Sequence, residues 1–268
     1  LEARTGIPVI GVIPMLDQVF PSEDSLDLLE RRSRKPNADL TIGVVRFPRI
    51  SNFTDFDPLD AEPTVNLKYI TTKDELNNCD AIILPGSKTT IADLNWLQQT
   101  GIAESIPNYL ANGGTIMGIC GGFQMLGNTL ADPTGIEGIP GEYPGLNILP
   151  LKTTISETKI TRQRTTTANY PDQDISIDGY EIHQGTTKWH PDGASIDEYE
   201  QLFIDETLGI VNRELTLWGT YLHGIFDNGK WRRNWLNQIR SRRNLAQITN
   251  DVPDYASQRA EIFDKLAD

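Results

Sequence analysis

Short apolar runs alternate with helical patterns between residues 40 and 120, and this alternation restricts the folds that the chain can adopt. The apolar runs are bounded by Gly, Pro or Asp, as buried strands usually are; they are Leu40–Val45, Leu67–Ile70, Ala81–Leu84 and Thr115–Ile119. Helical spacing is present over Thr89–Leu97 and over Ile102–Ala111, where Pro107 should interrupt the second helix. Strands that alternate with helices predict an α/β fold, with an open, largely parallel twisted sheet and helices on both faces.

The second half of the chain has a different pattern, with strand-like segments and few helices between them. Strands are expected over residues 146–160, 180–187, 208–213 and 215–222. Consecutive strands without intervening helices usually pair antiparallel, so antiparallel additions are predicted here. Helices are expected near residues 229–246 and 254–266.

The first 38 residues are predicted to belong to something other than the main domain. Ile7–Pro14 is a continuous apolar run typical of a buried parallel strand, and Ser22 can cap a short helix that ends at Leu29. One strand and one helix cannot form a core, and the stretch Ser33–Asp39 has the composition of a linker. We therefore expect residues 1–38 to be the remnant of a preceding domain, residues 39–268 to be the main domain, and residue 1 not to be the natural start.

Composition and charge exclude several kinds of partner. Lys and Arg number 24 against 37 Asp and Glu, and the net charge of −13 opposes nonspecific attraction to nucleic acid or to an anionic membrane. No run approaches the ~18 apolar residues of a membrane span, and the first residues do not form a secretory signal. The chain is therefore predicted to act in the cytoplasm.

The cysteine at position 120 is the strongest candidate for a catalytic group. Two cysteines are too few for a disulfide framework or a four-cysteine zinc site, and Cys79 is expected to be a packing residue. Cys120 lies in Gly-Ile-Cys-Gly-Gly (118–122), between an apolar strand and a helix-compatible stretch. This layout is typical of a nucleophile elbow, where the flanking glycines avoid clashes at a sharp turn and the helix N-terminus favours a thiolate. The alternative is a small buried cysteine at a Gly-rich strand end.

Three histidines are present, so the search for a general base is short. His223 follows the apolar run 217–222, and the carboxyl end of that strand should lie at the same sheet edge as Cys120. We predict His223 as the base, with a solvated histidine as the alternative. His183 also ends a strand-like segment and is expected to line the same cleft. His190 is expected in a turn, and no third ligand is spaced to form a metal site with these two residues.

A cysteine acyl-transfer site also needs hydrogen-bond donors for an oxyanion. In Leu-Pro-Gly-Ser-Lys (84–88) an apolar strand ends and a helix begins, so the N–H of Gly86 or Ser87 could face Cys120 together with that of Gly121. The alternative is a simple helix-capping turn. The segment lacks the glycine and lysine spacing of a P-loop.

These segments resemble the class I glutamine amidotransferases, through Gly118–Gln124, Leu84–Lys88 and Gly219–Gly224. More narrowly, Arg46–Leu59 and Gly179–His183 resemble the glutaminase half of the cobyric acid synthase family, which acts in cobalamin biosynthesis. The resemblance covers the chain from residue 40 to residue 245, and residues 1–33 are similar to the end of that family's ATP-dependent synthetase domain.

The resemblance implies Cys-mediated hydrolysis of glutamine, with the ammonia passing to the synthetase domain. There, ATP and Mg would serve the amidation of four peripheral carboxylates of a corrinoid, adenosylcobyrinic acid a,c-diamide, to give cobyric acid. That nucleotide site is not in this chain, for which no cofactor is implied. The implied roles are nucleophile for Cys120 and base for His223, oxyanion donors for Gly86 and Gly121, and substrate contacts for Gln124, His183 and Glu181.

One departure from the amidotransferase pattern concerns the group that orients the base. Class I enzymes commonly show His-Pro-Glu, whereas this chain has His223-Gly224-Ile225, and Ile225 cannot orient an imidazole. A Cys/His dyad, or another orienter such as Glu181, is therefore expected.

The sequence also allows other interpretations. The post-strand loop with Arg46, Arg49, Asn52 and Asp55 could contact the partner domain or an anionic corrinoid, or could simply be solvated. A cysteine hydrolase of the dienelactone hydrolase type would turn over esters, and a catalytically silent binding module for a synthetase would be inert.

Overall fold

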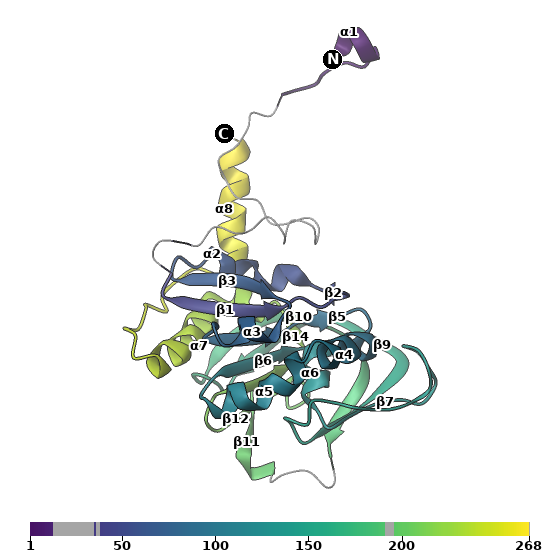
Figure 1. Ribbon diagram of the computed structural model, residues 1–268. Coiled ribbons are helices and arrows are strands. Elements are labelled where there is room, and N and C mark those ends of the chain that lie inside the picture. The colour runs from purple at the N-terminus through teal and green to yellow at the C-terminus, as the bar shows by residue number, and fades with distance from the viewer. Residues whose placement is uncertain (13–34, 36–37, 191–195, 268) are drawn as a thin grey trace.

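The computed structural model describes residues 1–12, 35, 38–190 and 196–267, and it confirms the predicted α/β class. Within these residues the main sheet has seven strands, in the order β11-β12-β13-β6-β4-β1-β3 (Figure 1). Their bounds are β1 Leu40–Val45, β3 Val65–Ile70, β4 Ala81–Leu84, β6 Thr115–Ile119, β11 Tyr199–Gln201, β12 Gly209–Asn212 and β13 Leu217–Thr220. The strands from β3 to β13 pair in parallel, and β12 and β11 are antiparallel additions, as the sequence predicts.

Helices cover both faces of this sheet (Figure 1). One face carries α3 Lys73–Leu76, α4 Thr90–Gln99, α5 Ile102–Ala111 and α6 Gly121–Leu126. The other face carries α2 Asp57–Ala61 and α7 Gly229–Arg242. Side chains alternate along each strand. Ile82 and Leu84 of β4 belong to the core on the face with α3, α4, α5 and α6, whereas Ala81 and Ile83 belong to the core on the face with α2 and α7. This alternation buries both faces of the parallel strands.

A second sheet was not foreseen as a separate unit. Strands expected around residues 146–160 and 180–187 do not extend the main sheet; they form a five-stranded sheet in the order β14-β10-β9-β7-β8. Its strands are β7 Thr129–Asp132, β8 Gly141–Pro144, β9 Leu151–Ala168, β10 Ile175–Trp189 and β14 Leu222–His223. The long antiparallel pair of β9 and β10 dominates it. Because strand pairing is decided by tertiary contacts, local pattern alone does not say which sheet a strand joins.

The remaining elements are short or lie near the ends of the chain. They are β2 Ile50–Ser51, β5 Gly86–Ser87, the 3₁₀ helices η2 Phe53–Phe56, η3 Ile196–Glu198 and η4 Ile225–Asp227, and the helices α1 Glu2–Thr5 and α8 Tyr255–Ala267. In the described ranges no helix is both long and apolar enough to cross a membrane.

The expected interruption of α5 at Pro107 is wrong. The helix runs without a break from Ile102 to Ala111 with Pro107 inside it. Pro107 is exposed, whereas Ile102, Ile106 and Tyr109 are buried against the sheet. Burial of this apolar face stabilises the helix enough to tolerate the backbone hydrogen bond that proline removes.

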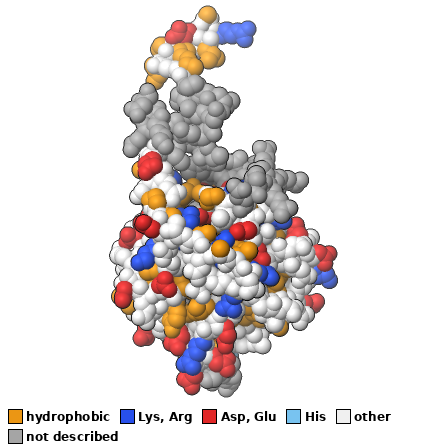
Figure 2. Space-filling model, turned by 90° about the vertical axis from the view of Figure 1, so that its left-hand side faces the viewer, with side chains coloured by type: hydrophobic (Ala, Val, Ile, Leu, Met, Phe, Trp, Pro, Cys, Tyr) orange, Lys and Arg blue, Asp and Glu red, His pale blue; other side chains and the backbone are white. Residues whose placement is uncertain are grey.

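The N-terminal predictions are met only in part by what the structure describes. A strand is expected over Ile7–Pro14, but residues 7–12 are not in a strand. They are exposed, and their apolar side chains are open to solvent (Figure 2). A buried parallel strand needs neighbours, and none of the described segments pairs with this one. The helix expected from Ser22 to Leu29 lies outside the described residues. Lys35, from the predicted linker, contacts the backbone carbonyls of Asp60, Glu62 and Val65 through its Nζ. The domain boundary near residue 38 stays a prediction.

Candidate active site

Cys120 occupies a strained turn between β6 and α6. It caps α6 with φ 52° and ψ −110°, a conformation that non-glycine residues rarely adopt. A Cβ atom on Gly122 would lie 1.9 Å from the Leu84 carbonyl oxygen, and one on Gly118 would lie 2.8 Å from the backbone of Gly122. The two flanking glycines are therefore required by close backbone approach, as the steric argument from sequence predicts.

His223 lies beside Cys120, although the two are far apart in sequence. It belongs to β14, which pairs with β10 through Tyr180 and His223. Its ring interacts electrostatically with Cys120, whose Sγ donates to the Ile182 carbonyl at 3.4 Å, and stacks on Tyr180 with centroids 5.1 Å apart. Both His223 and Cys120 are buried, with 1% and 8% of their surfaces exposed. The structure therefore brings together the two residues that the sequence pointed to.

A carboxylate that sequence reasoning had not connected with the base completes the group. Asp55 lies in η2, after β1, and its Oδ2 is 2.6 Å from His223 Nδ1. Its Oδ1 accepts a hydrogen bond from the Gly224 N–H at 3.2 Å. An ionised carboxylate only accepts hydrogen bonds, so Nδ1 carries the proton. The side-chain amide of Asn52 also contacts the ring, with Nδ2 3.0 Å from Nδ1.

The electrostatics of His223 are set by this contact. Burial by itself would lower the pKa of the imidazole, but the charge and hydrogen bond of Asp55, together with Cys120, raise it to about 10. His223 is thus an imidazolium at neutral pH. The positive ring therefore interacts with Asp55 and with Cys120, the predicted nucleophile.

The segments that carry the predicted oxyanion donors lie beside the catalytic pair. β5 brings Gly86 beside the base, so that a Cβ on Gly86 would lie 3.4 Å from His223 Cε1. A Cβ on Gly121 would lie 3.0 Å from the Ser87 backbone nitrogen. The hydroxyl of Ser87 donates to the buried carboxylate of Asp93 at 2.6 Å. The predicted oxyanion donors therefore lie next to the predicted catalytic pair.

Comparison with known proteins identifies the family to which this chain belongs. Residues 41–231 match the model of the CobB/CobQ-like glutamine amidotransferase domain. The chain belongs to that family. Its match spans the segments that carry Asp55, Cys120 and His223.

Relatives of this amidotransferase domain are similar over its whole length. Cobyric acid synthases from Nostoc sp., Synechococcus elongatus and Trichodesmium erythraeum are 57%, 54% and 53% identical to it. Each alignment covers 100% of this chain and 54% of the relative. The chain thus spans about half the length of the curated relatives it matches.

Solved structures share the fold of the amidotransferase domain. A glutamine amidotransferase crystal structure has a TM-score of 0.51 at 14% identity, covering 76% of this chain and 95% of that one. PurLQS from Thermotoga maritima has a TM-score of 0.50 at 19% identity, covering 69% of this chain and 87% of that one. At these identities the likeness establishes the fold alone.

Glu181 does not orient the base of this amidotransferase, so that hypothesis is wrong. Its Oε2 accepts hydrogen bonds from Arg162 and Arg164 at 2.8 and 2.7 Å, and its Oε1 is 2.9 Å from His183 Nε2. Alternation along β10 places Glu181 and His183 on the same face of the strand. Asp55 holds the position at His223 instead, and Ile225 is fully buried.

His183 and Glu181 line a cavity of about 380 Å³ whose lining does not include Cys120. Phe123 and Tyr221 also line it, and His183 stacks on Tyr221 with centroids 3.8 Å apart. Within the described residues His183 Nδ1 is buried without a hydrogen-bond partner. The Cys120 Sγ donates to the carbonyl of Ile182, the residue before His183, at 3.4 Å. That His183 lines the same cleft as Cys120, and that His183 and Glu181 contact the substrate, stay predictions.

Gln124 lies one helical turn after the nucleophile and is firmly held. Its Nε2 donates to the Gln184 carbonyl at 2.9 Å and to the Tyr221 hydroxyl at 3.2 Å. Its Oε1 accepts from the Thr90 hydroxyl at 3.3 Å. Residues four positions apart share a helix face, so Gln124 lies on the Cys120 side of α6.

Glu137 is a further residue at this site that the sequence did not indicate. Its Oε2 accepts the Ile91 N–H at 2.8 Å, and it hydrogen-bonds with Thr90, the residue that also contacts Gln124. Asp132 fixes its loop by accepting the N–H of Glu137 at 2.8 Å. Burial raises the pKa of the Glu137 carboxyl, and no lysine or arginine in the described part of the chain pairs with it. No short motif marks such a residue in a single sequence.

The loop after β1 is not uniformly solvated. Asp55 is only 5% exposed, so the interpretation of this residue as solvated is wrong. The guanidinium of Arg49 lies 3.6 Å from Asp93, and Arg46 is half-buried.

Cys79 is a packing residue, as expected: it is 2% exposed, and burial raises the pKa of its thiol to about 12.

Proposed function

We propose that this domain hydrolyses the side-chain amide of glutamine through Cys120, His223 and Asp55. The observation that carries the proposal is the contact chain from the Cys120 sulfur through the His223 ring to the Asp55 carboxylate. Membership of the glutamine amidotransferase family supplies the reaction class. An Asp also completes the triad of the dienelactone hydrolase type, but the family match and the cobyric acid synthase relatives favour the amidotransferase over that type and over the silent module.

The reaction begins with attack of the Cys120 thiolate on the carboxamide carbon of glutamine. The negative charge that develops on the amide oxygen is stabilised by the backbone N–H groups of Gly121 and of Gly86 or Ser87. His223 then donates a proton to the departing nitrogen, so that ammonia leaves and a glutamyl thioester remains. Water, deprotonated by His223, hydrolyses the thioester to glutamate and regenerates Cys120.

Asp55 acts on the base and not on the substrate. Its carboxylate accepts the Nδ1 proton, which fixes the ring orientation and stabilises the imidazolium. It therefore takes the place of the glutamate that class I enzymes commonly carry two residues after the histidine.

Glu137 is proposed to bind the α-ammonium group of glutamine. A half-buried carboxylate without a cationic partner is costly, and a substrate ammonium would compensate its charge. Its contact with Thr90 places it one hydroxyl away from Gln124, on the same side as Cys120.

Glu137→Gln should therefore impair glutamine selectively. We expect kcat/KM for glutamine to fall about 10- to 100-fold, the range for loss of a charged hydrogen bond. Glutaramate, which is glutamine without its amino group, should lose less than about threefold. Glu142→Gln serves as control, because Glu142 is exposed and pairs with Lys152. An equal loss for both substrates would show that Glu137 only supports the loop.

The ammonia is proposed to serve a synthetase that lies outside this chain. The relatives are cobyric acid synthases, and the chain spans about half of their length. By the resemblance given above, the partner domain would use ATP and Mg to amidate peripheral carboxylates of adenosylcobyrinic acid a,c-diamide. On this proposal the present domain needs no cofactor of its own and acts in the cytoplasm.

One experiment tests the glutaminase proposal directly. The protein is incubated with glutamine while ammonia is measured, and separately with a glutamine-mimicking alkylating agent while the labelled peptide is sequenced. We expect ammonia release and a label on Cys120. A label on another residue, or no ammonia even with the synthetase half restored, contradicts the proposal.

A further inference from the structure

The carboxylate and the imidazole of the proposed triad come from segments that are distant in sequence. Asp55 and His223 are separated by 168 positions, and Ile225 occupies the place where the local chain could have supplied a carboxylate. The distance between Asp55 and His223 is therefore fixed by tertiary contacts, and not by the local chain. The groups that lock these two segments together control the base.

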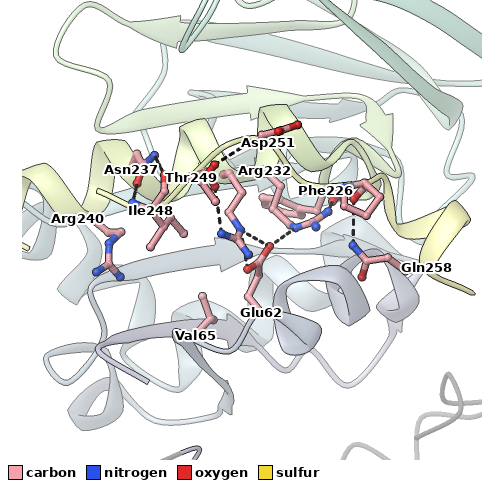
Figure 3. Close-up of polar contacts among 12 residues, drawn as sticks. Glu62, Val65, Phe226, Arg232, Asn237, Arg240, Ile248, Thr249, Asp251 and Gln258 are labelled. Atoms are coloured by element: carbon pink, nitrogen blue, oxygen red, sulfur yellow. Dashed lines mark hydrogen bonds and ion pairs between the residues drawn. The ribbon is translucent and has the colours of Figure 1, made fainter. Parts of the chain in front are cut away.

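A buried ion cluster joins the two segments. η2, which contains Asp55, runs directly into α2, and Glu62 is the C-cap of α2. Arg232 of α7 donates from Nε to Glu62 Oε1 at 2.7 Å and from Nη1 to the Phe226 carbonyl at 2.5 Å (Figure 3). Phe226 lies in η4, three residues after His223. One guanidinium thus holds the end of the Asp55 segment and the start of the segment after His223.

A second arginine pairs with Glu62, and the ion cluster is shielded from water. Arg233 Nε lies 2.8 Å from Glu62 Oε2. Glu62 and Arg232 are 3% and 2% exposed, and η2, α2 and α7 all contact η4. Buried ion pairs are often no more stabilising than apolar residues of the same size, so stability alone does not explain this arrangement. What the planar guanidinium supplies is fixed geometry, because its donors are rigidly spaced.

We propose that Glu62 and Arg232 are positioning residues that set the contact between Asp55 and His223. The inference rests on the proposed glutaminase function and deepens it. Arg232 acts through the η4 backbone and Glu62 through α2, and neither is assigned a contact with glutamine. A shift of about 1 Å between a base and its partner is enough to cost up to about 100-fold in rate.

The test compares two buried arginines on the same helix. Arg232→Lys keeps the charge near Glu62, but an ammonium cannot hold Glu62 and the Phe226 carbonyl in one fixed fork. Arg240→Lys is the matched control: Arg240 is also buried on α7 (Figure 3), and it bonds Asp39 and the Ala246 carbonyl, which lie outside η2, α2 and η4. We expect kcat for glutamine to fall about 10- to 100-fold in Arg232→Lys with KM within about twofold, and both to stay within about twofold in Arg240→Lys.

A double-mutant cycle distinguishes positioning from general support. Because Arg232 is proposed to act through the contact between Asp55 and His223, adding Arg232→Lys to Asp55→Asn should reduce kcat by less than about twofold further. A full additional loss, or kcat losses in both arginine variants that follow their loss of thermal stability, overturns the proposal. If Arg232→Lys does not fold, Glu62→Gln takes its place in the same cycle.

A readout without substrate separates this inference from the glutaminase proposal. The Nδ1 proton that His223 donates to Asp55 should give a downfield NMR resonance, in a site that also faces Cys120, Tyr180 and Asp227. We expect the resonance to shift or broaden in Arg232→Lys and to be unchanged in Arg240→Lys. An unchanged resonance in both contradicts the positioning role, whereas absence of ammonia from the unmodified protein contradicts only the glutaminase proposal.

Discussion

Cys120→Ser is expected to reduce ammonia release from glutamine at least about 10⁴-fold and to abolish labelling by a glutamine-mimicking alkylating agent. Serine keeps the size of the side chain, but His223 is already protonated through Asp55 and cannot take a proton from a hydroxyl. A serine hydroxyl is also a much weaker nucleophile than a cysteine thiol unless a base removes its proton. The measurement is kcat for glutamine together with mass spectrometry of the labelled peptide.

Cys79→Ser is the matched control for this change. Cys79 is the other cysteine of the chain and is 2% exposed in the core, away from the catalytic segments. We expect lower thermal stability, because a polar hydroxyl replaces a buried thiol, with kcat within about twofold of the unmodified protein. A catalytic loss in Cys79→Ser equal to that in Cys120→Ser would contradict the assignment of the nucleophile.

Asp55→Asn is expected to give the second largest effect, a loss of about 10³- to 10⁴-fold in kcat with little change in KM. The amide is almost the same shape as the carboxylate, but it carries no charge and can present an N–H to Nδ1. The ring would then lose both its orientation and the stabilisation of its positive form. Asp60→Asn is the control, because Asp60 lies on the adjoining helix and pairs with Lys35. A kcat for Asp55→Asn within about tenfold of the original would remove Asp55 from the mechanism.

The same variant should change how stability depends on pH. Burial alone would lower the pKa of His223, and Asp55 and Cys120 raise it from the ordinary value of 6.5 to about 10. Stability from this raised pKa is fully present below pH 6.5 and is lost as pH rises through about 10. Thermal unfolding should therefore show the largest destabilisation by Asp55→Asn near or below pH 6.5, with the difference shrinking toward pH 10. A difference that grows with pH would show that Asp55 does not stabilise an imidazolium.

The sequence predicts the site residues correctly where local chain geometry determines their positions. The strand before Cys120 and the flanking glycines mark a turn whose backbone approaches Leu84 too closely for any side chain. His223 could be paired with Cys120 because carboxyl ends of neighbouring parallel strands meet at one sheet edge. The same rule places the loop after β1, which carries Asp55, at this edge, since β1 lies in the same sheet, but it does not say which side chain of the loop contacts the base.

The sequence by itself determined the alternation of strands and helices, the elbow at Cys120 and the choice of His223. All three follow from short-range sterics and from the geometry of parallel strands. Only the tertiary structure decided that β9 and β10 form a separate sheet, that Glu181 pairs with arginines, and that Asp55 holds the base. These depend on contacts between segments up to 168 positions apart, which packing of the whole chain selects and no local pattern encodes.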